Sequence, residues 1–173
     1  MDNIDNAVKD YNKALNMISK VNNLTNKSKL TNEVKAFVDA GNNFDVCTSE
    51  INSISNADYQ FCKANAGYCF CYAAVLSSKL SQAKNYAGGA IDLLNEAKDG
   101  NGWSKFDVKK CDFLISQMQK ILDYQNHTND VAPQWGTNSH FYLDIDQGKG
   151  SKLIVGAIIL AIGLWFVKSK VMK

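Results

Sequence analysis

The chain has 173 residues, of which 46% are apolar, and its formal net charge is +2 at pH 7. That length suits one ordinary domain with a short appendage, and the apolar fraction is enough to build a core. The charge is nearly balanced and no residue is arginine, whose guanidinium is the group that best binds phosphates and base edges. The composition therefore argues against a nucleic-acid partner.

The N-terminal third predicts two amphipathic helices, because its apolar residues recur at steps of three and four. The first stripe consists of Ile4, Val8, Tyr11, Leu15 and Ile18. The second consists of Leu30, Val34, Phe37, Phe44, Cys47, Ile51 and Ile54. Gly41 falls on the second stripe, where we expect the helix to bend or pause. Asp58 is placed to cap the helix that follows.

The longest stripe lies in the middle of the chain. It consists of Tyr59, Cys62, Ala66, Cys69, Ala73, Leu76, Leu80, Ala83 and Ala87. After Gly88 and Gly89 the pattern resumes with Ile91, Leu94 and Ala97. The sequence thus predicts either one long helix kinked at the glycine pair or two helices that meet there. Since the side chains are mostly small, we expect this stripe to be the closely packed centre of the fold.

A fourth helix is predicted after the stop signal Asp99–Gly102. Its capping box is Ser104 with Asp107, and its stripe consists of Val108, Cys111, Ile115, Met118 and Leu122. From Gln125 to Gly150 the periodicity is lost. The aromatic residues of this segment, between Trp135 and Tyr142, are expected either in a lipid headgroup layer or against a partner, or else packed on the base of the bundle.

Together these patterns predict an all-α fold with three parts. Residues 1–125 form an antiparallel bundle of about four long helices, and residues 126–152 form a short irregular aromatic segment next to the membrane. Residues 153–172 form one C-terminal transmembrane helix.

The predicted span begins with fifteen uncharged residues, Leu153 to Val167. As a helix they cover about 22 Å, which is less than the roughly 30 Å of a hydrocarbon core. Flanking lysines such as Lys152 and Lys168 can extend to the headgroups and cover the difference. The anchor residues are Leu153, Ile154, Ile158, Ile159, Leu160, Ile162, Leu164, Trp165 and Phe166. A buried core helix is the alternative, and the uniformly apolar, terminal, lysine-flanked character of the segment opposes it.

Small residues within the span are spaced for contact with a second membrane helix. They are Gly156, Ala157, Ala161 and Gly163, and ordinary glycine and alanine content explains them equally well. The polar N-terminus is no signal peptide. We therefore expect a single-pass protein inserted after synthesis, with its bundle in the compartment of synthesis.

Five cysteines occur, and four of them fall on the predicted stripes: Cys47, Cys62, Cys69 and Cys111. Cys71 points away from the stripe that holds Cys69. One interpretation is that all are small buried hydrophobic residues. The other is one or two disulfides in which Cys47 and Cys111 pair with Cys62 or Cys69, and an odd count leaves at least one free thiol.

The common catalytic and ligand-binding motifs are absent from the sequence. It lacks the paired cysteine spacings of zinc sites, the nucleophile elbow, the phosphate-binding loop and the dinucleotide fingerprint. His127 and His140 stand in the irregular segment and match no catalytic pattern. We therefore expect no catalytic residues, metal or cofactor, and no small-molecule substrate; the protein is expected not to be an enzyme.

A cysteine-containing helical bundle before a C-terminal span resembles the layout of entry-associated membrane proteins of large DNA viruses. The resemblance implies a component of a virion that has a lipid layer. Some of those proteins look to be myristoylated on a glycine directly after the initiator Met, whereas this sequence has Asp2 there, which excludes the modification. The likeness is one of architecture and assigns no role to any residue.

The sequence thus favours a membrane-anchored structural or interaction protein. Its expected partners are the lipid bilayer and other protein subunits, such as capsid components or members of a membrane complex. One alternative is a tail-anchored adaptor on an organelle surface such as the mitochondrial outer membrane. Another is an accessory or redox subunit that uses the cysteine cluster.

Overall fold

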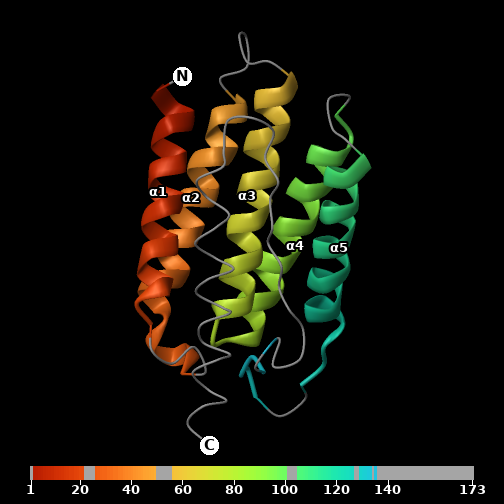
Figure 1. Cartoon of the computed structure of the whole chain (residues 1–173). Coiled ribbons are helices and arrows are strands. Elements are labelled where there is room, and N and C mark those ends of the chain that lie inside the picture. The colour runs from red at the N-terminus through yellow and green to blue at the C-terminus, as the bar shows by residue number, and fades with distance from the viewer. Residues whose placement is uncertain are drawn as a thin grey trace, which may run out of the picture.

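The structure, a computed structural model, describes residues 2–21, 26–49, 56–100, 105–126, 129–133 and 135. The described residues hold five α-helices, a short 3-10 helix and no strand. In chain order the elements are α1 (Asp2–Ser19), the 3-10 helix η1 (Lys27–Lys29), α2 (Thr31–Ser49), α3 (Asn56–Leu76), α4 (Leu80–Lys98) and α5 (Lys105–Asp123). Successive α-helices run in opposite directions (Figure 1). The predicted all-α bundle is confirmed, with five long helices in place of about four.

Helix α3 occupies the centre of the bundle. It packs along α2 on one side and α4 on the other, while α1 packs mainly on α2 and α5 mainly on α4 (Figure 1). Two hydrophobic cores result, one among α1, α2 and α3 and one among α3, α4 and α5. Every residue of α3 from Gln60 to Leu76 is buried or half-buried. Its mostly apolar composition reflects this position, because a helix with neighbours on all sides buries every face; its buried polar residues are Gln60, Lys63 and Asn65.

The core among α1, α2 and α3 is built on the first two predicted stripes. Tyr11, Phe37 and Phe44 are fully buried, and Tyr11 meets both phenylalanine rings edge to face at centroid distances of 6.3 and 6.2 Å. Edge-to-face pairs of this kind add to the free energy gained by burying the rings. The predicted stripe residues Ile51 and Ile54 lie outside the described residues.

Gly41 serves close packing, and of the predicted bend or pause at this residue the pause is wrong. Helix α2 continues through Gly41 to Ser49. A Cβ atom on Gly41 would lie 3.0 Å from the Cβ of Cys69 and 3.1 Å from the ring of Phe70. A residue with a side chain would therefore force α2 and α3 apart at this point.

The long middle stripe divides at a place that the sequence analysis did not predict. Both alternatives placed the break or kink at Gly88 and Gly89, but α4 runs unbroken through that pair. The chain instead turns between Leu76 and Leu80. Thus Leu80, Ala83 and Ala87 belong to a helix antiparallel to the one that carries Cys62, Ala66 and Ala73, although both sets are buried as predicted.

The remaining helix ends agree in part with the predicted signals. Helix α4 ends at Lys98, directly before the predicted stop. Asp58 lies in the first turn of α3 and not at its cap, because the helix begins at Asn56. On α5, Cys111 and Met118 are buried as predicted, and Leu114 and Ile121 join them. The capping serine Ser104 is outside the described residues.

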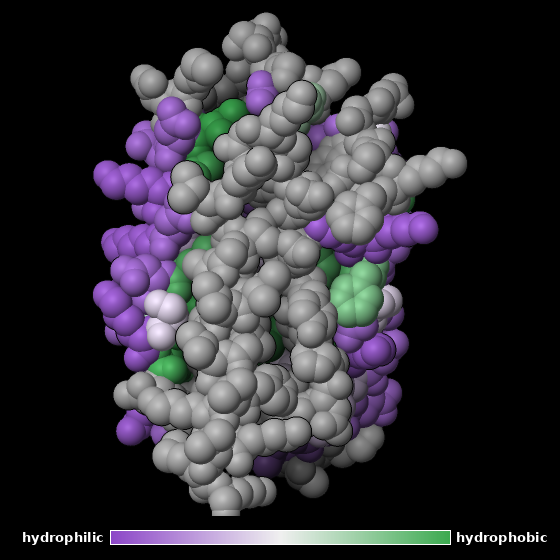
Figure 2. Space-filling model, viewed as in Figure 1, coloured by the Kyte–Doolittle hydropathy of each residue, from purple (hydrophilic) through white to green (hydrophobic). Residues whose placement is uncertain are grey.

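In the part of the chain that the structure describes, no helix combines the length and apolar character that a membrane crossing requires. The predicted span Leu153–Val167 lies beyond that part, as do its small residues from Gly156 to Gly163, so the predictions about them stay predictions. Within the described residues the outer sides of α1 and α5 are mostly hydrophilic (Figure 2).

Candidate functional site

The five cysteines are the first candidates for chemistry, and the structure buries all five side chains. Cys47 and Cys62 lie together where α2 faces α3, close enough for a hydrogen bond between their thiols. Cys71 belongs to the other core, together with Cys111 of α5. The predicted disulfides stay predictions. The structure adds that Cys62 has Cys47 as its neighbour and that Cys71, which points away from Cys69 as predicted, is buried too.

The environment of these thiols suppresses their reactivity. Burial raises the pKa of Cys62 to about 12 from its ordinary value of 9.0, and the neighbouring Cys47 adds to the increase. Burial also raises the pKa values of Cys69 and Cys71. Because the thiolate is the nucleophile and the metal ligand, thiols in such surroundings behave as inert core residues.

A charged cluster joins three helices near the end of the bundle where α3 begins. The ammonium of Lys63 on α3 lies 2.7 Å from Asp45 of α2 and 2.7 Å from Glu96 of α4. Burial lowers the pKa of Lys63, but the hydrogen bonds to both carboxylates outweigh that effect and raise it. The cluster thus keeps the nearly buried ammonium of Lys63 charged and connects α2 and α4 through α3.

The opposite end of the bundle holds the second polar cluster, which is formed by residues far apart in sequence. Asp130, which follows α5, accepts hydrogen bonds of 2.6 Å from both the backbone amide and the hydroxyl of Ser81. Its carbonyl accepts from the amide of Leu80 at 3.3 Å, and the amide of Ala132 donates to the carbonyl of Ser78 at 2.8 Å. The hydrogen bonds from Ser81 lower the pKa of Asp130. Asp130 therefore acts as the N-cap of α4, since Lys79 at the cap position supplies no side-chain hydrogen bond.

Lys27 of η1 holds the same segment from another side. Its ammonium donates to the carbonyl of Pro133 at 2.5 Å and lies 5.6 Å from the centroid of the Trp135 ring. Burial lowers the pKa of Lys27 to about 8. Trp135 also meets Tyr124 edge to face at 5.3 Å. Trp135 therefore packs on the base of the bundle, which is one of the placements that the sequence predicted for the aromatic segment.

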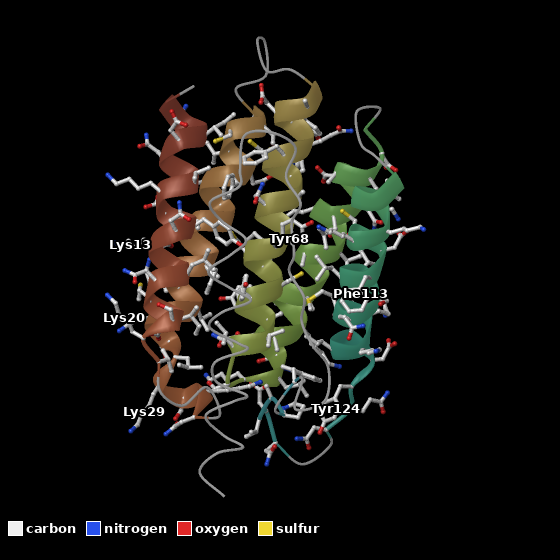
Figure 3. All side chains as sticks on the ribbon, in the orientation of Figure 1. Lys13, Lys20, Lys29, Tyr68, Phe113 and Tyr124 are labelled. Carbon is white, nitrogen blue, oxygen red and sulfur yellow. The ribbon has the colours of Figure 1, made fainter. Side chains whose placement is uncertain are left out.

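The end of the bundle that contains these contacts is called the η1 end below. It comprises the end of α1, η1, the turn between α3 and α4, and the chain from Tyr124 to Trp135. Lys20, Lys29 and Lys79 are exposed there, and so are Tyr124 at 37% and Val131 at 56%. Figure 3 shows Lys20, Lys29 and Tyr124 at this end, whereas Lys13 lies nearer the N-terminus of α1.

Other candidate sites within the described residues are weak. They contain no group of three or more histidine, cysteine, aspartate or glutamate side chains that could hold a metal. A shallow, open depression lies between the start of α4 and the chain after α5, and it is lined by Leu80, Ser81, Lys84, Gln125, Asn126, Asn129 and Asp130. Apart from Leu80 its lining is polar, unlike the apolar enclosed pockets that bind small molecules. His127 and His140 are outside the described residues.

The sequence analysis missed the residues that organise both ends of the bundle. Lys63 had a recognisable signal, because it is a lone charge in an otherwise apolar stretch of α3. Lys27 and Asp130 had none: Lys27 stands in a polar stretch, and Asp130 caps its helix through Ser81, which lies 49 positions earlier in the chain.

Comparison with known protein families found no matching family model, and comparisons with curated proteins and with solved structures found no match.

Proposed function

We propose that the protein is a membrane-anchored interaction protein, in which the helical bundle is held at a lipid bilayer as a component of a larger assembly. The observation that carries this proposal is the uncharged segment Leu153–Val167 with lysines on both sides. A segment of this composition favours the bilayer, since its leucine, isoleucine, valine and phenylalanine residues each contribute about −0.3 to −0.6 kcal/mol to insertion.

The described bundle supports an interaction role over a redox role. The thiols on which a redox subunit would depend are all buried, and burial raises the pKa values of Cys62, Cys69 and Cys71. The charged side chains that are most buried, Lys27 and Lys63, are engaged in holding elements together. The assembly in this proposal is a virion membrane or a membrane complex, and its protein partners contact the exposed helix faces.

Flotation of the full chain with lipid vesicles tests the anchor. We expect the wild-type chain to float and to resist extraction at high salt and alkaline pH. Ile159→Lys places a charge at midspan, at a cost of about 2.5 to 3.5 kcal/mol on insertion scales, and should leave most of the chain in the dense fraction. Ser151→Lys adds the same charge outside the apolar segment and serves as the matched control. A wild-type chain that stays in the dense fraction would refute the proposal.

The assembly part of the proposal has a separate test. The full chain is extracted from its source membrane in a mild detergent, and its mass is measured by size-exclusion chromatography with light scattering. We expect a species well above the mass of one 19.1 kDa chain with its micelle, containing further protein subunits. A single chain alone in its micelle would refute the assembly without affecting the anchor.

A further inference from the structure

We infer that the η1 end of the bundle is a membrane-contacting surface, which docks on the anionic headgroups of the bilayer that holds the anchor. The inference rests on the proposed function and goes beyond it, because it states which end of the bundle meets the lipid and through which residues. Three independent observations support it: the course of the chain, the distribution of charge and the exposed apolar side chains.

The course of the chain brings the anchor to this end. Asp130 is fastened to the start of α4 and Lys27 binds the carbonyl of Pro133, so the chain is held at the η1 end as far as Trp135. From there residues 136–152 lead to Leu153. Seventeen residues separate this fixed point from the anchor, so the path to the bilayer is shorter from the η1 end than from the far end, which is a helix length of about 28 Å away. Because seventeen extended residues can span about 56 to 61 Å, the tether alone does not choose the end, and the charge and the exposed side chains decide it.

Charge differs between the two ends of the bundle. Lys20, Lys29 and Lys79 are exposed at the η1 end, and no ion pair within the described residues involves Lys20 or Lys29. Asp130 is the one carboxylate among the residues of this end, and it stays negatively charged because its hydrogen bonds come from the neutral groups of Ser81. The lysines of this end therefore outnumber its carboxylates. Each lysine close to an anionic membrane strengthens binding roughly five-fold.

The opposite end carries exposed carboxylates. Asp5 lies near the start of α1, Asp58 lies in the first turn of α3, and Asp99 follows α4. An anionic surface therefore attracts the η1 end and repels the other end, which favours one orientation of the bundle over the inverted one.

The exposed apolar side chains also favour the η1 end. Of the four large hydrophobic side chains that are exposed within the described residues, Tyr124 and Val131 lie there, on the chain that leads towards the anchor. Tyrosine and tryptophan are the residues enriched at the membrane–water interface, where an aromatic body meets a polar tip. The η1 end thus combines exposed lysines with a tyrosine, a valine and a half-buried tryptophan, which is the composition that a headgroup layer binds.

The test measures which end of the anchored bundle lies near the headgroups. Ser28→Cys places a reactive thiol at the η1 end, and Asn6→Cys places one on α1 near the other end; both positions are exposed, whereas the five native cysteines are buried. Each full-length variant is labelled with a fluorophore and reconstituted into vesicles that contain a quencher on the lipid headgroup. The vesicles are phosphatidylcholine alone or phosphatidylcholine mixed with phosphatidylserine, and flotation of each sample reports anchoring separately.

We expect the label at residue 28 to be quenched several-fold more than the label at residue 6 in vesicles with phosphatidylserine. The charge-reversing pair Lys20→Glu and Lys29→Glu should abolish that difference. The control pair Lys9→Glu and Lys13→Glu reverses the same number of charges nearer the N-terminus of α1 and should preserve the difference in quenching. Flotation with equal quenching at both positions, or the same difference without phosphatidylserine, would overturn this inference alone. Failure to float would overturn the proposed anchor and this inference together.

Discussion

The two cores that share α3 are filled by different kinds of side chain. Among α1, α2 and α3 the centre is aromatic, with Tyr11, Phe37 and Phe44 fully buried and Phe37 stacked on Tyr72 at 4.4 Å. Among α3, α4 and α5 it consists mainly of alanines and aliphatic side chains, including Ala83, Ala87, Ala90 and Leu94. Rings fill a wide space between helices, whereas alanines let helix backbones approach. Apart from the close approach at Gly41, the first core is therefore expected to be sensitive mainly to loss of volume and the second mainly to gain of volume.

The largest expected effect comes from removing a ring. Phe44→Ala should destabilise the fold by about 3 to 5 kcal/mol, because a buried phenylalanine leaves a cavity that the surrounding helices fill only in part. Val46, two residues further along α2, is 54% exposed, and Val46→Ala should stay within about 0.5 kcal/mol. Urea unfolding followed by circular dichroism measures both. Equal midpoints for the two variants would contradict an aromatic core at this position.

The next effect concerns alkaline pH and the thiol at Cys62. Burial raises its folded-state pKa to about 12 from an ordinary value of 9.0. In the unfolded chain the thiol loses its proton near pH 9, while the folded protein retains it, so stability is lost as the pH rises from 9 towards 12. The loss is at most about 1.4 kcal/mol per pH unit and is reduced where solvent screens the site.

The comparison between wild type and Cys62→Ala isolates this thiol, because all other titrating groups are common to both proteins. We expect the free energy of unfolding of the variant to fall less steeply between pH 9 and 11 in urea titrations. Parallel pH profiles would show that Cys62 titrates normally in the folded state and is not enclosed.

Gain of volume is tested where α3 and α4 are closest. A Cβ atom on Gly67 would lie 2.7 Å from the Cγ of Leu94, so Gly67→Ala requires Leu94 or the helices to move. Overpacking of this kind costs about 1 to 3 kcal/mol, and the better helix propensity of alanine offsets only part of it. We expect a net loss in thermal melts. A gain in melting temperature would mean that the second core is loosely packed.

The smallest expected effect is a gain in stability at Gly88, where a helix break or kink was predicted and α4 in fact continues. A Cβ atom on Gly88 would meet nothing within 4 Å, so Gly88→Ala should stabilise α4 by about 0.5 to 1 kcal/mol through helix propensity alone. The two glycine-to-alanine changes thus form a pair, in which Gly67→Ala reports packing against Leu94 and Gly88→Ala reports the conformational freedom of the backbone. Destabilisation by Gly88→Ala would indicate a contact on this face of α4.

The contrast between Gly88 and the turn before Leu80 shows how far the sequence could predict this fold. Helix type and buried faces follow from the three-four spacing of apolar residues, and these predictions are confirmed for Tyr11, Phe44, Cys62 and Met118. The division of α3 from α4 does not follow, because the turn at residues 77–79 contains neither glycine nor proline. The α4 N-terminus is capped by Asp130 from beyond α5, and no window of local sequence contains both partners.

The candidate sites were predictable to a similar degree. The burial of Cys47, Cys62, Cys69 and Cys111 followed from their positions on the stripes, since each stripe must face a neighbouring helix, whereas the burial of Cys71 did not. Which thiols are neighbours did not follow, because the pairing of Cys62 with Cys47 depends on how α2 and α3 are aligned. The η1 end was equally hidden, since the contact of Lys27 with Pro133 joins residues 106 positions apart.

The central position of α3 has a consequence for how the chain folds and opens. Because each long helix packs mainly on its neighbours in sequence, most contacts are local, and topologies of this kind fold rapidly. Neither core exists without α3, so the backbone amides of α3 should exchange with solvent only on global unfolding, whereas α1 and α5 each border one core and can detach singly. Two long-range contacts add to these local ones: Lys27 to Pro133 joins the start of the bundle to its end, and Asp130 to Ser81 joins the chain after α5 to the start of α4.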